Sequence, residues 1–115
     1  MTRDFNMDLV YSGGNLLVKL RGELDHPAAN SFRSKIQPLL EEGKIDNLVI
    51  NMEGLNFIDS SGIGVILGRY NYLQKKGGKV KVCNLEPQVK KVFDATGLFS
   101  IIKEYPSEKD ALENR

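Results

Sequence analysis

The segment with the greatest potential for chemistry is DSSGIG, residues 59–64, in which two serines follow an aspartate and precede two glycines. An apolar run precedes this segment and an amphipathic stretch follows it, which predicts a turn from a strand into a helix. Such turns are common functional positions in open α/β sheets. The first N–H groups of a helix lack partners within it, and small residues leave them accessible. We therefore expect Ser60 to be reachable from outside.

A simpler explanation of the same residues is helix capping. Either Asp59 or Ser60 could accept hydrogen bonds from the first helical turn, and spacing alone does not favour a functional serine over a cap. Capping needs one residue, however, and each glycine costs a helix about 1 kcal/mol relative to alanine. The glycines therefore indicate another purpose. We expect Gly62 and Gly64 to give another molecule access to the start of the helix, and Gly64 and Gly68 also to let the helix approach its neighbours.

Two enzymatic or ligand-binding interpretations of this segment are weak. The three glycines form G-x-G-x-x-x-G, one residue too long for the dinucleotide pattern, and no phosphate-binding G-x-x-x-x-G-K-[ST] run is present. A serine hydrolase would need a base, but His26 is the only histidine, and Ile58 stands where a nucleophile elbow has glycine. A hydrolase is therefore disfavoured, while a small ligand at the start of the helix stays an open alternative.

Composition excludes several other classes. Sixteen basic and fifteen acidic residues give a net charge of +1, so no basic stripe for nucleic acid is expected. The lysines near residues 75–81 fit a solvated sheet edge. Cys83 is the only cysteine, and no Cys and His set has metal-ligand spacing, so we expect neither a disulfide within the chain nor a metal nor another cofactor.

The chain of 115 residues fits one domain, 1–115, with a core at about residues 7–112. Its apolar fraction of 41% and charged fraction of 27% are typical of soluble globular proteins. Residues 1–7 contain no apolar segment, and no window approaches the roughly 20 apolar residues of a membrane helix. We expect a cytoplasmic protein with no membrane segment.

Short strands are predicted from apolar patterning. Residues 8–11 and 16–20 flank a Ser-Gly-Gly-Asn turn and should form an antiparallel hairpin. The continuous apolar run within residues 47–52 predicts a central strand, followed by a loop over residues 53–59. Val80 and Val82 alternate with lysines in a fourth strand, and residues 99–102 should form a short last one.

Four helices are expected between and after these strands. The first begins at Asp25 and Pro27 and runs to about Gly43, with a kink at Pro38. The second covers residues 60–76, and the third begins at Pro87 and ends at Gly97. Ser107 and Asp110 resemble a capping box that starts a short fourth helix. The expected core positions of the second helix are Ile63, Ile66, Leu67, Tyr70 and Leu73.

The order β-β-α-β-α-β-α-β-α predicts an α/β protein with a mixed four- to five-stranded β-sheet and interspersed α-helices. Residues 56–70, NFIDSSGIGVILGRY, closely resemble the signature of the STAS family of anti-sigma-factor antagonists, especially its sporulation branch. The segments GELDH (22–26), VKVC (80–83) and VFDATGLF (92–99) resemble the same branch. The resemblance covers nearly all of residues 7–112 and implies a single STAS domain.

In that family the first serine of D-S-S-G is phosphorylated, which implies a phosphorylation site at Ser60. The resemblance also implies that Asp25 lies near this serine and that the exposed side of the second helix contacts the partner. Helical period predicts that this side, opposite the expected core, presents Ser61, Val65, Arg69 and Tyr72. With Asp25, the predicted partner-binding residues are Asp59, Ser61, Gly62, Val65 and Arg69.

The implied partner is an anti-sigma factor that is also a serine kinase and carries ADP or ATP. The unphosphorylated protein would bind it and release the sigma factor, phosphorylation of Ser60 would end this binding, and a serine phosphatase would restore it. The protein itself would be a non-enzymatic monomer when free. The alternatives are an antagonist of the general-stress type and a stand-alone STAS domain that binds a nucleotide or other small ligand.

Overall fold

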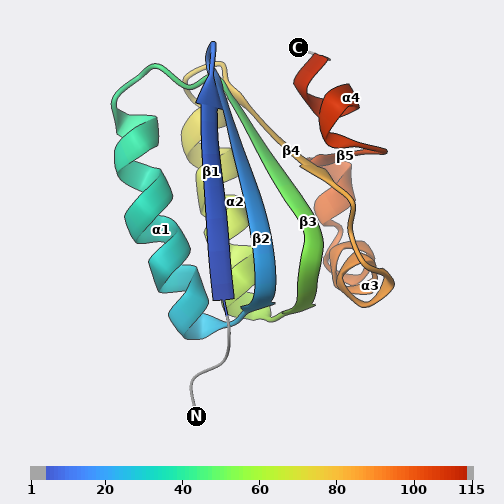
Figure 1. The fold of residues 1–115 in the computed structure, drawn as a ribbon. Coiled ribbons are helices and arrows are strands. Elements are labelled where there is room, and N and C mark those ends of the chain that lie inside the picture. The colour runs from blue at the N-terminus through green and yellow to red at the C-terminus, as the bar shows by residue number, and fades with distance from the viewer. Residues whose placement is uncertain (1–4, 114–115) are drawn as a thin grey trace.

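Five strands form one mixed sheet in the order β1-β2-β3-β4-β5, so neighbours in the sheet are also neighbours in the sequence (Figure 1). The computed structural model describes residues 5–113; residues 1–4, part of the predicted N-terminal segment, and residues 114–115 lie outside this range. The strands are β1 (Phe5–Ser12), β2 (Asn15–Leu24), β3 (Asn47–Ile58), β4 (Lys79–Cys83) and β5 (Lys103–Tyr105). Strand β1 is antiparallel to β2, and the other pairs are parallel. The predicted α/β fold with a mixed sheet is confirmed.

The helices divide unequally between the two faces of the sheet. They are α1 (His26–Glu41), α2 (Ser60–Gln74), α3 (Pro87–Thr96), the 3-10 helix η1 (Leu98–Ser100) and α4 (Glu108–Glu113). Helices α1, α2 and α3 share one apolar cluster with one face of the sheet, which we call the inner face. Right-handed crossovers between successive parallel strands produce this one-sided arrangement. Only α4 packs on the opposite, outer face within the described residues.

The predicted hairpin and several element boundaries are confirmed. Gly13 and Gly14 form the turn between β1 and β2 with φ angles of 55° and 87°, the positive values that a two-residue hairpin loop needs. Val80 and Val82 belong to β4 and are buried. The Ser107 hydroxyl accepts a hydrogen bond from the Asp110 N–H at 3.1 Å, so the predicted cap does start α4.

The predicted loop over residues 53–59 is wrong, because β3 continues to Ile58. Two irregularities in its pairing with β2 absorb the extra residues, and Leu24 still pairs with Ile58 at the end of both strands. Such bulges bend a strand without ending it. The consequence is that only Asp59 separates the end of β3, the central strand, from the start of α2.

One further local prediction is tested in part and one is corrected. Helix α1 continues through Pro38 to Glu41 without a break, and the kink at this proline stays a prediction. The expected strand at residues 99–102 is instead η1 and a turn. Gly97 has a φ of 71°, and the Leu98 carbonyl accepts the N–H groups of Ile101 and Ile102. The last strand therefore begins only at Lys103.

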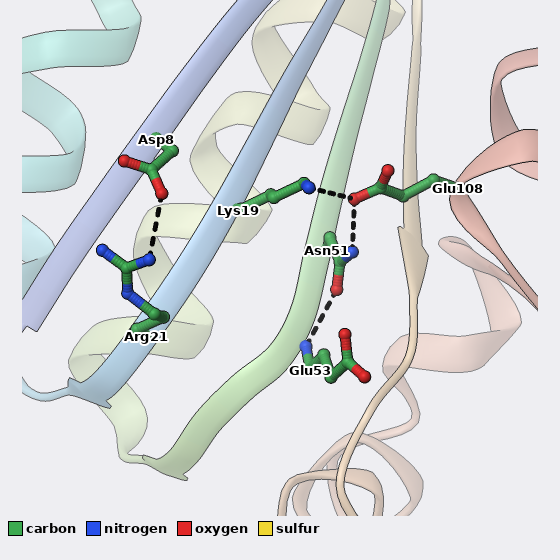
Figure 2. A network of polar contacts seen from close by, with 6 residues as sticks. All are labelled: Asp8, Lys19, Arg21, Asn51, Glu53 and Glu108. Carbon is green, nitrogen blue, oxygen red and sulfur yellow. Dashed lines mark hydrogen bonds and ion pairs between the residues drawn. The ribbon is translucent and has the colours of Figure 1, made fainter.

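A polar network joins α4 to the outer face (Figure 2). The Glu108 carboxylate accepts a hydrogen bond from Asn51 Nδ2 and lies 3.6 Å from Lys19 Nζ. Asn51 Oδ1 accepts the Glu53 N–H at 2.9 Å, so one amide joins the backbone of β3 to the side chain of Glu108 on α4. Beside this network on the outer face lies a small apolar cluster that includes Leu17, Val49, Cys83 and Ala111.

Candidate functional site

The candidate site lies where α1 and α2 both begin, at the carboxyl ends of β2 and β3 (Figure 1). Asp25 is the N-cap of α1, and its Oδ1 accepts the Ala28 N–H at 3.1 Å. Asp59 is the N-cap of α2, and its Oδ1 accepts the N–H groups of Ser61 and Gly62 at 2.9 and 3.1 Å. Both carboxylates thus satisfy N–H groups that the helices leave unpaired.

The two helix starts are held together by polar contacts. The Asp59 N–H donates to the Leu24 carbonyl at 3.4 Å, which ties the start of α2 to the end of β2. His26 Nδ1 and Ser61 Oγ lie 3.1 Å apart across the two helices. The structure therefore brings the segment of Asp25 beside the DSSG segment.

The two adjacent serines differ in their surroundings. Ser60 is the first residue of α2 and is exposed, and its hydroxyl has no hydrogen-bond partner among residues 5–113. Ser61 is half-buried, and its hydroxyl contacts His26. Since Asp59 provides the cap, Ser60 is not needed for capping. Its hydroxyl is available to a reagent that approaches from solvent.

The predicted role of Gly62 in access is wrong. Gly62 is buried, and a Cβ atom on it would lie 2.5 Å from the Leu24 carbonyl oxygen and 2.7 Å from Ile58 Cγ1. Side-chain carbons essentially never come this close to other atoms, so Gly62 is required for packing α2 on the sheet. The sequence could not reveal this, because the obstructing atoms belong to β2 and β3.

The predicted role of Gly64 and Gly68 in close packing is also wrong. A Cβ atom on either residue would have no neighbour within 4 Å among the described residues outside the helix's own adjacent backbone. Gly64 is exposed, and Gly68 is half-buried. These two glycines leave a bare strip of helix backbone beside Ser60 that packing does not explain.

The predicted exposed side of α2 in fact faces α1. Val65 is 6% exposed, and Ser61 meets His26 of α1. Burial, and to a lesser degree the positive charge of Arg33 on α1, lowers the pKa of Arg69. Tyr72 is half-buried. The prediction failed because α2 packs against both the sheet and a neighbouring helix, whereas helical period was used to assign only one buried side.

The observed exposed strip of α2 follows Ser60 at helical spacing. It contains Ser60, Gly64 and Asn71, all exposed, with Gly68 at its margin, and the exposed Lys75 follows directly after the helix. Within the predicted core stripe, Ile66 and Leu73 are buried, whereas the other three are partly exposed. The signal that sequence reasoning missed is the run of small and polar residues that continues from Ser60 at intervals of three or four.

The chemistry of this site is limited. The His26 ring has one polar contact among the described residues, with Ser61, so no carboxylate there orients it as a catalytic base. The Asp59 carboxylate already occupies the N–H groups that a free phosphate ligand would use at the start of α2. No group of three or more potential metal ligands occurs among residues 5–113. An exposed hydroxyl at the start of a helix is the reactive group that remains.

Comparisons with known proteins agree on one family. The sequence profile of the STAS domain matches residues 6–111. The chain is 37% identical over 109 residues to the anti-sigma F factor antagonist of Paenibacillus polymyxa. This alignment covers 95% of this chain and 93% of that protein.

No helix within residues 5–113 has the length and hydropathy to cross a membrane.

Two solved structures are similar over almost the whole chain. The unphosphorylated form of the anti-sigma factor antagonist SpoIIAA matches with a TM-score of 0.83 and 33% identity, covering 96% of this chain and 94% of that one. The phosphorylated form of SpoIIAA, described as a Bacillus cell fate determinant, matches with a TM-score of 0.76 and 32% identity, covering 96% and 97%.

Proposed function

This chain belongs to the STAS domain family, and we propose that it is an anti-sigma-factor antagonist that is switched off by phosphorylation of Ser60. In its unphosphorylated form it binds an anti-sigma factor in the cytoplasm and so releases a sigma factor. The anti-sigma factor is itself a serine kinase with bound ADP or ATP, and a serine phosphatase reverses the modification. The protein acts by binding and is not an enzyme.

The observation that carries this proposal is the contrast between the two serines. Ser60 has an exposed hydroxyl with no hydrogen-bond partner among the described residues, while the hydroxyl of Ser61 contacts His26. The similarity to SpoIIAA, which is known in unphosphorylated and phosphorylated forms, gives this contrast its functional meaning. Ser60 is therefore the proposed acceptor of the phosphate.

We place the partner contact on the exposed strip of α2 that begins at Ser60 and continues through Gly64 and Asn71. The absence of side chains at Gly64 and Gly68 lets a partner approach the helix backbone there. This replaces the surface that helical period first indicated. Asp25 and Asp59 contribute by fixing the two helix starts beside the strip.

Two free energies explain why phosphorylation would end binding without unfolding the protein. A phosphate at a helix N-terminus gains about 0.3–1 kcal/mol from the helix dipole, and repulsion from Asp59 partly offsets this gain. At the interface, burial of about −1.5 to −2 added charge without a compensating cation costs several kcal/mol. Since about 1.4 kcal/mol is tenfold in affinity, a loss of about a thousandfold follows.

The site assignment is tested with the cognate kinase and Mg-ATP. We expect one phosphate per chain, located on Ser60 by peptide mass mapping. Ser60→Ala should abolish labelling, and the matched variant Ser61→Ala should leave it. Phosphate on Ser61, or full labelling of Ser60→Ala, would refute the assignment.

Calorimetric titration of the anti-sigma factor tests the switch, with ADP or ATP present. We expect Ser60→Asp to bind far more weakly than the wild type, and Ser60→Ala to bind well but resist inactivation by the kinase. Circular dichroism and melting temperature should be nearly unchanged in both variants. Equal affinities for the wild type and Ser60→Asp would contradict an electrostatic switch.

A further inference from the structure

A second candidate site lies at the other end of α2, beside the open edge of β4. A cavity of about 520 Å³ is lined there by residues from α2, β4 and β5 and the chain between them. Its polar side chains are Tyr70, Gln74, Lys79, Lys81, Lys103 and Tyr105. Gln74 is the last residue of α2, whereas Ser60 is the first, so the cavity and the phosphorylation site are separated by the length of the helix.

The cavity exists because β5 is short. Strand β5 pairs only with residues 81–83 of β4, so within the described residues the beginning of β4 has no strand on the side away from β3. The turn that replaces the expected strand at residues 99–102 leaves Ile101 at the rim, where it is 43% exposed. Val80 also lines the cavity, which therefore has an apolar part as well as a polar one.

The charge of the lining is one-sided. Among the described residues, three lysines line the cavity and no aspartate or glutamate does. Lys79 and Lys103 form no ion pair within residues 5–113. Lys103 Nζ lies 5.0 Å from the centre of the Tyr105 ring, and Lys81 Nζ lies 5.2 Å from the same ring centre. Lys81 as a whole is only 2% exposed. A concave surface lined by one sign of charge concentrates counterions.

We propose that this cavity binds a small organic phosphate. Lys79 and Lys103 bind the phosphate group as two accessible point charges. The organic part lies against Val80, Ile101 and the Tyr70 ring. The cavity volume falls in the usual range of about 300–1,000 Å³ for small-molecule sites. Lysines that only protect a sheet edge from aggregation would need neither the hollow nor Tyr70 and Gln74 in its lining.

Phenyl phosphate is a suitable probe because it combines the two parts, and phenol and inorganic phosphate each present one of them. The full chain, labelled with ¹⁵N, is titrated with each compound and followed by NMR. We expect saturable shifts for phenyl phosphate at the amides of residues 70–74, 79–81 and 103–105, with much weaker effects of the other two. No saturation up to 10 mM, about the weakest binding worth assigning to a site, would overturn the proposal.

Matched variants distinguish binding in this cavity from a general effect of the protein's net charge. Lys79→Gln with Lys103→Gln should weaken phenyl phosphate binding at least tenfold, while Lys75→Gln with Lys76→Gln removes the same charge outside the lining and should change it less than twofold. Equal losses in the two variants would overturn the proposal. Ser60→Asp should bind phenyl phosphate normally, so failure of this site and failure of the proposed switch are distinguishable.

Discussion

The two faces of the sheet are covered in different ways. On the inner face, α1, α2 and α3 enclose a continuous apolar cluster, which includes Phe32, Ile66 and Phe93, all fully buried. On the outer face, the short helix α4 packs its Ala111 in a cluster with three buried residues of the sheet and is joined to the sheet by the Asn51 and Glu108 network (Figure 2). Burial of apolar area is the dominant favourable term in folding, whereas a hydrogen bond contributes only about 1 kcal/mol. The inner face therefore carries most of the stability, and the outer face fixes the position of α4.

The same difference determines how the site is held. The inner face fixes the position of Ser60, because Gly62, two residues after Ser60, packs against Leu24 and Ile58. A change at this contact should affect the whole fold. Changes on the outer face should instead act mainly on α4. Within the described residues, this helix has its main contacts with three strands, β3, β4 and β5.

The largest effect is expected for Gly62→Val. The new Cβ atom would lie 2.5 Å from the Leu24 carbonyl oxygen, and backbone cannot move aside as a flexible side chain can. We expect a loss of about 3 kcal/mol or more in the free energy of unfolding, measured by urea denaturation. Gly64→Val is the control and should change stability by less than about 1 kcal/mol. Similar urea midpoints for the two variants would mean that the inner face tolerates this crowding.

A smaller effect is expected at high pH from Cys83. Burial, assisted by the nearby carboxylates of Glu108, Glu53 and Glu104, raises the pKa of this thiol from 9.0 to about 12. The folded state therefore keeps the proton longer than the unfolded state. This contribution is fully present below about pH 9 and is lost as the pH rises to about 12, at up to about 1.4 kcal/mol per pH unit.

Urea denaturation between pH 8 and pH 10.5 checks this prediction. The wild type should lose stability more steeply than Cys83→Ala, in which no thiol titrates. If the unfolding free energies of the two proteins changed with pH in parallel, water would reach the Cys83 thiol, and the cluster under α4 would not be closely packed.

A loss of about 1–2 kcal/mol in the free energy of unfolding is expected for Asn51→Ala. The variant removes the partner of Glu108 and the acceptor of the Glu53 N–H, and it leaves both groups partly buried. Amide hydrogen exchange should speed up in residues 108–113 more than in α1. Lys19→Ala is the control, because its ammonium is half-exposed and its ion pair should contribute less than about 1 kcal/mol. A loss as large as that of Gly62→Val would break the contrast between the faces.

The smallest change, a gain, is expected for Gly64→Ala. Alanine fits the open space there and favours helix, so stability should rise by about 0.5–1 kcal/mol. The added methyl group also stands on the proposed docking strip, so affinity for the anti-sigma factor should fall severalfold in calorimetric titration. Unchanged affinity would remove Gly64 from the proposed contact surface.

Local chemistry made much of this structure predictable. Asp25 and Asp59 start helices because a carboxylate beside free N–H groups is a local arrangement, and the sequence shows both partners. The hairpin glycines and the apolar residues Val80 and Val82 of β4 are equally local, whereas the burial of Lys81 between these valines is not. The family resemblance added the significance of Ser60, which capping chemistry alone could not separate from Asp59.

The failures share a different cause. The three glycines of α2 look alike in sequence, yet Gly62 meets the end of β2 and Gly64 meets solvent. Val65 looks exposed until α1 is placed beside it. Strand β3 continues past its apolar run because β2 continues to pair with it. In each case the deciding atoms lie on an element distant in sequence, so no local pattern contains the information.

The strand order has a consequence for how the protein forms during synthesis. Each parallel strand joins the sheet beside the strand made just before it, so no later segment has to insert between two strands already paired. Short sequence separation between partners lowers the entropy lost on closing each loop and favours fast folding. A chain emerging from the ribosome can extend the sheet one unit at a time, and α4 covers Cys83 and Val49 only once residues 108–113 have been made. The outer face is therefore completed after the inner face.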